Sequence, residues 1–375
     1  MVGGCAASAD KAKGAAGAPD ASAAGAKAAG HESATPTAGA PRPLAPDDIV
    51  LDLSPAAEVV SLWLGPTDAK RARARAIATE PPYRTLRDYL SSIMRCVATD
   101  EEIERAIVFP DSGACGFGLE PAYRERASLD SLVRALVLRS DTLRARVARD
   151  AGAYAPPAPW RPIRVYFVIS TRYLFDAAAL DRSLDSGAPA IVFNLSEALG
   201  YGESTAERAA IVERVLAHES FHAALRQVEF GRPAWDLYRD PVNAFDYITR
   251  VMLDEGVAHY IDWKGRAGSD TLFTAKVGGR ERHAFDQLAL ACRRIRDPRT
   301  DPDARSEIIG LAASGLIWSK YGAISGMFAA WRIEHAWGQD SLRAIVERGP
   351  REFLRAYREV AAADTTLKRL PKELD

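Results

Sequence analysis

The sequence predicts an α+β fold that is predominantly helical and has a small β-sheet before a long central helix. Two short segments, 164–169 and 190–195, are rich in β-branched and aromatic residues, as expected of strands. Apolar residues recur with a helical period through most of the remaining chain. The third observation is His-Glu-Ser-Phe-His at 218–222, an HExxH pattern that lies on the predicted central helix.

The composition is that of a globular protein. The chain has 375 residues, of which 47% are apolar and 26% charged, enough for a sizeable core. Its formal net charge is −1, so nothing favours a nucleic-acid or anionic-membrane surface, and we expect no nucleic acid as a partner. We expect three regions: a tether over 1–42, a helical region over 43–158 and a domain over 159–375 that contains the HExxH pattern.

Residues 1–42 are rich in Ala, Gly, Ser and Pro and contain no aromatic residue. Such a segment buries too little apolar surface to offset its ordering entropy, so we expect a disordered tether in which His31 belongs to no site. Val-Gly-Gly-Cys at 2–5 resembles the end of a bacterial lipobox, which implies an extracytoplasmic lipoprotein anchored to the cell envelope through Cys5. The charged and apolar segments of a signal peptide are missing, so either the given start lies too late or the match is due to chance.

The region 43–158 contains no chemical motif, so we expect it to have a structural role. It should form a helical layer that packs on the rest of the chain. Its helical patches, separated by loops with Pro and Gly, are 54–64, 71–78, 86–94, 100–108 and 129–148. Cys96 and Cys115 flank one loop and could pair in an oxidising compartment, whereas Cys292 is expected to be a buried free thiol. No CxxC spacing occurs, which argues against a zinc–thiolate site.

The central helix has clear predicted boundaries. Ser204 and Glu207 form an S-x-x-E capping box, so the helix should begin near Thr205. Gly231 and Pro233 predict its end. Apolar residues follow a 4-3-4-3 spacing along the helix, and both histidines of the HExxH pattern lie within this apolar stripe.

His218 and His222 lie on the same side of this helix, because four residues are only slightly more than one turn. Both imidazoles can therefore reach one Zn²⁺. Glu219, beside the first histidine, can hold and deprotonate a metal-bound water. The alternative is a helix with two core histidines that neighbouring groups satisfy.

A catalytic zinc needs a third protein ligand, and Glu255 on the next predicted helix is the candidate. This helix should begin at 240–243. Glu255 lies on its apolar face, where an unpaired carboxylate is costly and coordination to a cation would remove the cost. The alternatives are an ion pair of Glu255 with an arginine, or coordination by His259 one turn later. Gly256 and Ala258 are small and predict close packing against the HExxH helix.

HESFH followed by EGVAHY resembles the gluzincin branch of the zincin metallopeptidases and, more narrowly, uncharacterised zinc-dependent peptidases with HExxH and EGxA signatures. The resemblance covers 160–362 and implies a zincin-like domain with one Zn²⁺ per chain, bound by His218, His222 and Glu255. It implies a hydrolase that cleaves peptides or proteins by a metal-activated water, with Glu219 as general base. The interval from His222 to Glu255 is longer than in the best-known gluzincins, so an extra loop is expected between the helices.

The same resemblance implies that an edge strand of the small sheet binds the extended substrate backbone, and 191–195 is the candidate. It also implies an oxyanion-stabilising tyrosine on a helix after the glutamate ligand. Tyr321 resembles this tyrosine in position, with a core tyrosine as the alternative. Lesser candidates are Tyr260 and His335.

A carboxylate is expected to orient one of the ligand histidines. Asp262, one turn beyond His259, is the first guess, and Asp246 and Asp254 are alternatives. The C-terminal third is expected to be helical over 280–295, over 311–331 and from 349 onward. The segment 311–331 is long and apolar, but Lys320 and several glycines interrupt it, so we expect a buried helix pair and no transmembrane span.

Two other functions stay open from the sequence. One is a non-catalytic binding protein anchored in the cell envelope; the intact Glu219 argues against it, since a structural zinc site has no use for that carboxylate. The other is a zinc hydrolase that acts on a non-peptide amide or ester. A long cleft would favour a peptide and a closed pocket a small molecule. The sequence does not predict an oligomeric state.

Overall fold

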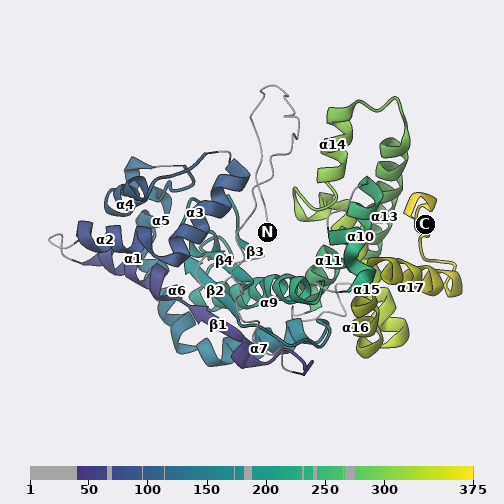
Figure 1. The fold of residues 1–375 in the computed structure, drawn as a ribbon, viewed down its shortest axis with the longest axis horizontal. Coiled ribbons are helices and arrows are strands. Elements are labelled where there is room, and N and C mark those ends of the chain that lie inside the picture. Colours follow the sequence, from purple (N-terminus) through teal and green to yellow (C-terminus); the bar gives the residue numbers. More distant parts are fainter. Residues whose placement is uncertain are drawn as a thin grey trace, which may run out of the picture.

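The computed structural model describes residues 40–65, 70–94, 96–113, 115–172, 174–180, 188–229, 232–239, 243–264, 266 and 275–374. Most of the predicted tether, with Cys5 and His31, lies outside the described residues, so the lipid anchor stays a prediction. Helices dominate the described chain, and a small sheet precedes the central helix α9 (Thr205–Glu229), which confirms the α+β fold class. The sheet and the N-terminal helices lie on one side of α9 and the C-terminal helices on the other (Figure 1).

The sheet has the strand order β1-β2-β4-β3. Its strands are β1 (Ile49–Asp52), β2 (Ile163–Val168), β3 (Ala177–Leu180) and β4 (Ala190–Asn194). β2 and β4 are the two strands that the sequence predicts, and they are parallel to each other, whereas β3 is antiparallel to β4. The prediction that 191–195 is an edge strand is wrong, because β4 pairs with β2 on one side and β3 on the other. The edge strands are β1 and β3. The sequence of β3, Ala-Ala-Ala-Leu, lacks the β-branched and aromatic residues that indicate strands.

The N-terminal helices pack beside this sheet (Figure 1). They are η1 (Pro46–Asp48), α1 (Ser54–Leu64), α2 (Lys70–Thr79), α3 (Pro81–Met94), α4 (Asp100–Val108), η2 (Pro110–Ser112), α5 (Glu120–Arg124), α6 (Arg126–Leu138) and α7 (Ser140–Gly152). The single helix predicted over 129–148 is instead two helices, because Arg139 leaves the helical conformation at φ −110° and ψ 10°. Cys96 and Cys115 form a disulfide with their Cα atoms 6.1 Å apart, and Cys292 is a buried free thiol.

The C-terminal half follows β4, and its described residues contain helices joined by turns and loops, with no strand. Besides α9, its helices are α8 (Leu195–Ala198), η3 (Pro233–Trp235), α10 (Asp236–Arg239), α11 (Ala244–Lys264), α13 (Ala275–Arg296), α14 (Pro302–Gly310), η4 (Ile317–Ser319), α15 (Tyr321–Trp337), α16 (Gln339–Arg348), α17 (Pro350–Ala363) and η5 (Lys372–Leu374). η3 and α10 occupy the interval in which the extra loop was expected. None of the described helices is both long and apolar enough to cross a bilayer.

The segment 311–331 is helical only from Tyr321 onward. Before it, the chain makes turns and the short η4, and Gly315 has a φ of +98°. A left-handed residue cannot continue a right-handed helix, so the first member of the predicted helix pair is replaced by turns and the short η4, and α15 is the second. The turn brings residues 313–315 and Lys320 to the wall of a cavity that is described below.

The two central helices begin where their capping residues predict. The hydroxyl of Ser204 accepts a hydrogen bond from Glu207 N (3.2 Å), and the Glu207 carboxylate accepts one from Ser204 N (2.9 Å), so the predicted capping box is present. The side-chain oxygen of Asn243 accepts from Phe245 N and Asp246 N, both at 2.9 Å, at the start of α11.

Helix α11 lies unusually close to α15 through two glycines. A Cβ at Gly326 would lie 1.9 Å from Met252 O, and a Cβ at Gly256 would lie 2.5 Å from the Gly326 carbonyl carbon. Real Cβ atoms do not come this close to backbone atoms, so both positions require glycine. The sequence predicted that Gly256 lets α11 approach the HExxH helix, and this is wrong, because the face that carries Gly256 meets α15.

Candidate metal centre

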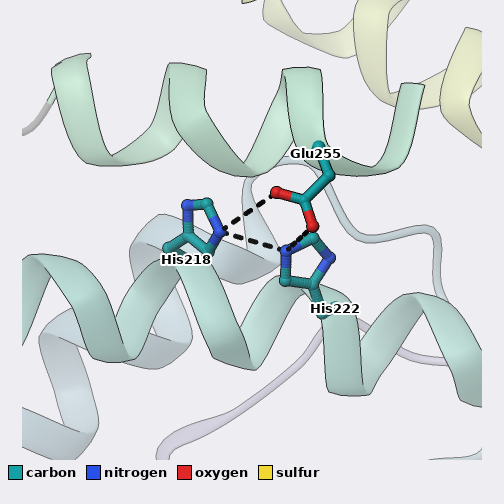
Figure 2. A group of neighbouring side chains, drawn as sticks. All are labelled: His218, His222 and Glu255. Atoms are coloured by element: carbon teal, nitrogen blue, oxygen red, sulfur yellow. Dashed lines mark hydrogen bonds and ion pairs between the residues drawn. The ribbon is translucent and has the colours of Figure 1, made fainter. Parts of the chain in front are cut away.

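Three side chains from two helices point toward one another (Figure 2). His218 and His222 come from α9, and Glu255 comes from α11. The Nε2 atoms of the two histidines are 3.0 Å apart. Glu255 Oε1 lies 3.7 Å from His222 Nε2, and Glu255 Oε2 lies 3.8 Å from His218 Nε2.

These distances fit a tetrahedral zinc site. Ligand atoms that each lie about 2.0–2.1 Å from a tetrahedral zinc are roughly 3.3 Å from one another. The two histidine nitrogens are 3.0 Å apart, and Glu255 approaches each of them with a different oxygen, at 3.7 and 3.8 Å. With one ligand atom taken from each residue, all three atoms lie within 4.8 Å of one another. Two imidazole nitrogens and one carboxylate oxygen are also a donor set that zinc prefers. The cluster is therefore able to bind one metal ion.

The cluster lines a cavity of about 550 Å³. On one side the wall is made by β3 and the residues just before it, 174–179. On another it is made by residues 313–315 and by Lys320. Tyr89 and Met94 from α3 also line the cavity. A substrate of several atoms can therefore reach the cluster from one face of the molecule.

Asp254 orients His222. Its Oδ1 lies 2.5 Å from His222 Nδ1, so the imidazole directs Nε2 toward the cluster. Burial lowers the pKa of His222, but Asp254 and Glu255 outweigh this and raise the pKa to about 9 in the metal-free chain. Burial raises the pKa of Asp254, but the positive charge and hydrogen bond of His222 hold it below its ordinary value.

Asp254 was only an alternative in the sequence-based prediction, in which Asp262 was the first candidate for the orienting carboxylate. Asp262 ion-pairs with Arg214 (3.2 Å) and Arg266 (2.7 Å), whereas the carboxylate bonded to a ligand histidine is that of Asp254. Asp246 accepts a hydrogen bond from Asn243 at the start of α11.

Glu219 lies beside the ligand cluster and is held by the edge strand β3. Its Oε2 accepts a hydrogen bond from Ala179 N at 2.9 Å, and the residue is 8% exposed. The side chain of Arg226, from the same helix, donates to Ala179 O. Ala179 of β3 therefore positions the carboxylate of Glu219 and the guanidinium of Arg226 next to the cavity.

His259 lies just outside the cluster. Its ring packs edge-on against His218 with centroids 4.7 Å apart, and its Nε2 is 3.8 Å from Glu255 Oε2. Burial, and secondly His218, lower its pKa well below the ordinary 6.5, so this imidazole is neutral at pH 7. Among the described residues its Nε2 has no hydrogen-bond partner. The geometry brings Glu255, and not His259, together with the two histidines of α9.

Tyr321 directly follows Lys320 in the sequence, but unlike Lys320 it does not line the cavity. Its hydroxyl donates to Ile308 O at 2.9 Å, and Tyr321 is absent from the cavity lining. The lesser candidates Tyr260 and His335 do not line the cavity either. The preceding residue, Lys320, does line it and is only 8% exposed. The sequence signal that could have identified Lys320 is its charge within an otherwise apolar stretch.

Comparison with known proteins gives one match. A family model with the description "Putative zinc dependent peptidase (DUF5700)" matches residues 79–366, which is more than half of the chain. No curated protein and no solved structure gives a significant match. The match agrees with the sequence-based prediction of zinc as the cofactor, and it covers both helices that carry the His-His-Glu cluster.

Proposed function

The chain belongs to the DUF5700 family, and from this premise we propose that it is a zinc metallopeptidase of the gluzincin type. His218, His222 and Glu255 bind the metal, and Glu219 is the general base. The convergence of these three ligands beside an intact Glu219, inside one cavity, is the observation that carries the proposal. Zinc binding itself needs only the three ligands, so the fourth side chain, the Glu219 carboxylate beside them, supports activation of a water molecule.

Zinc bound by the cluster would supply Lewis-acid chemistry and would lower the pKa of water toward neutrality. Ala179 N holds Oε2 of Glu219, which leaves the other carboxylate oxygen to accept a proton from the attacking water. As the new C–O bond forms and the C–N bond breaks, Glu219 passes that proton to the leaving nitrogen. The hydrogen bond to the edge strand keeps the carboxylate oriented through both proton transfers.

The edge strand supports a peptide as the substrate. Outward and inward backbone groups alternate along β3, and Ala179 uses its outward N–H and C=O on Glu219 and Arg226. By the same alternation, Ala177 directs its N–H and C=O away from β4, and Ala177 lines the cavity. An extended peptide can therefore pair with β3 at Ala177, beside the ligand cluster.

We also propose an extracytoplasmic location. The Cys96–Cys115 disulfide supports it, because such bonds persist mainly in oxidising compartments. Localisation of the full chain after fractionation of its native cells tests this independently of activity.

The function is tested by zinc content and peptide cleavage on the same samples. We expect about one zinc per chain in the wild type, and its loss in His218→Ala and Glu255→Ala. Glu219→Gln should keep its zinc but lose about three orders of magnitude in kcat on an internally quenched peptide library. His259→Ala is the matched control on α11 and should keep its zinc.

The outcomes separate the competing assignments. If His259→Ala loses the metal while Glu255→Ala keeps it, the gluzincin assignment of the third ligand is wrong. If the zinc-loaded wild type cleaves no peptide but hydrolyses simple esters or acyl amides, the substrate class is wrong. If the wild type binds no zinc even when zinc is supplied, the enzyme proposal fails and a binding protein is the better account.

A further inference from the structure

Lys320 is a buried cation that faces the cavity without a partner. It is 8% exposed, it lines the cavity, and among the described residues its ammonium makes no hydrogen bond or ion pair. A buried ammonium is costly unless an anion or several acceptors surround it. A buried ammonium in the cavity wall therefore implies that a negatively charged or hydrogen-bond-accepting group binds beside it.

The carboxylates of the cavity do not supply the missing partner. Glu219 accepts from the backbone of β3, and Asp254 is bonded to His222. Glu255 faces the two ligand histidines. Asp176 is the fourth carboxylate that lines the cavity, and it too forms no ion pair with Lys320. The charge of Lys320 is therefore left for a group that enters the cavity.

The backbone on both sides of Lys320 is held in place. Trp318 packs edge-on against Trp263 of α11 with ring centroids 5.0 Å apart. On the other side, the hydroxyl of Tyr321 donates to Ile308 O, and Lys320 O accepts the first-turn hydrogen bond from Ile324 N at 2.9 Å. Lys320 is therefore presented by a rigid junction between η4 and α15, as a preorganised donor needs to be.

Lys320 also lies near the metal cluster. Burial is the main cause that lowers the pKa of His218 and of His259, and the positive charge of Lys320 lowers both pKa values further. The ammonium thus acts on His218 of the cluster and on His259 beside it. Glu219 is bound to β3, which forms another wall of the same cavity.

We propose that Lys320 is a catalytic residue whose ammonium binds the carbonyl oxygen of the scissile amide and stabilises the negative charge that develops there. This inference rests on the proposed peptidase function. As the water oxygen bonds to the carbonyl carbon, the π electron pair moves onto the carbonyl oxygen, and Lys320 donates a hydrogen bond to it. When the C–N bond breaks, the pair returns to re-form the carbonyl, and Glu219 gives its proton to the leaving nitrogen. Lys320 keeps its own proton throughout.

The test uses Lys320→Met and Lys320→Arg in the zinc-loaded full chain, with Lys368→Met as a matched control at an exposed lysine that pairs with Asp286. The substrate is the best-cleaved peptide of the quenched library, made with a free and with an amidated C-terminus. We expect Lys320→Met to lower kcat by about 10²–10³-fold on both forms, with KM changed far less. Lys320→Arg should recover at least tenfold of that loss, because it keeps a charged donor.

Zinc content and thermal unfolding are measured on every variant, since a structural role would lower both while a catalytic role leaves both unchanged. If Lys320→Met does not fold, Lys320→Gln replaces it. The inference is overturned if neither neutral variant lowers kcat in a folded, zinc-loaded protein. It is also overturned if only the free-acid peptide is affected and only in KM, which would make Lys320 an anchor for the substrate carboxylate. A loss of kcat in Tyr321→Phe but not in Lys320→Met would return the role to Tyr321. A zinc-loaded wild type that cleaves no peptide overturns the proposed function, and this inference with it.

Discussion

Helices α9 and α11 both supply ligands to the candidate metal centre, but they are positioned in different ways. The two histidines of α9 face one metal because four residues make about one helical turn, whatever surrounds the helix. Glu255 of α11 reaches the same point only because α11 is held between α9 and α15. The comparison teaches that half of this site is a local property of one helix and the other half is a property of packing.

The closest packing of α11 is on its side toward α15. There Gly256 and Gly326 bring the two backbones into contact, so that neither position can accept a Cβ without movement. On the side toward α9, Asp254 bonds to His222 and Glu255 completes the cluster. A shift of α11 away from α15 must therefore also move Asp254 and Glu255 relative to α9.

The largest effect is expected from Gly326→Ala. The new Cβ would lie 1.9 Å from Met252 O, so α11 must shift, at a cost to stability of about 3 kcal/mol, and zinc affinity should fall because Glu255 moves with the helix. Gly310→Ala is the control, because its Cβ meets nothing within 4 Å and should leave stability equal or slightly higher. Urea unfolding and zinc titration measure both. Equal stability of Gly326→Ala and the wild type would show that packing does not hold α11 so tightly.

The next effect is expected from Asp254→Asn. The change removes the carboxylate on α11 that orients His222 of α9. Zinc affinity should therefore fall about 10- to 100-fold, while both helices stay folded. Asp262→Asn is the matched control on the same helix, because Asp262 ion-pairs with Arg214 and Arg266 and not with His222. A competition titration against a zinc chelator measures the affinity. An equal loss in both variants would contradict an orienting role that is specific to Asp254.

The same pair predicts the pH dependence of the zinc-free chain. The pKa of His222 is raised from 6.5 to about 9, so its ion pair with Asp254 stabilises the fold fully below about pH 6.5, and the contribution is lost as pH rises through 9. The pKa of His218 is shifted in the opposite direction, so its contribution to stability has the opposite pH dependence. Its pKa is lowered to about 4 by burial and by His222, so its contribution is present above pH 6.5 and is lost as pH falls through 4.

Stability of the zinc-free chain should therefore decline between about pH 6.5 and 9, and Asp254→Asn should flatten this decline. Urea unfolding after treatment with a chelator measures it, with Asp262→Asn again as the control. An unchanged alkaline decline in Asp254→Asn would mean that another group titrates there.

The smallest effects are expected at the helix starts, where both helices depend on local signals alone. Ser204→Ala removes the cap of α9 and Asn243→Ala the cap of α11, and each should lower the free energy of unfolding by about 1 kcal/mol. Zinc affinity should change little in either variant, because both caps lie more than two turns from the ligands. Chemical denaturation with zinc present and absent tests this; a larger loss of affinity in Asn243→Ala would show that the start of α11 also positions Glu255.

Residue patterns within single helices and strands were sufficient for much of the fold and for the first half of the site. The capping box at Ser204 predicted the start of α9, and the HExxH spacing predicted that two histidines and Glu219 belong to one site. β2 and β4 were recognisable because their side chains are β-branched and aromatic. All of these features arise from contacts between residues that are close in sequence.

The remaining features depend on which neighbour each face meets, and the periodicity of a helix does not contain that information. Asp254 and Asp262 lie on one helix, yet only the first turns toward His222. Lys320 and Tyr321 are adjacent, yet the junction before α15 directs one into the cavity and the other toward Ile308. The edge position of β3 follows from sheet topology, because its alanines carry no strand signal of their own. The angle between two residues of one helix is a local quantity, whereas the direction of that helix is decided by every surface packed against it.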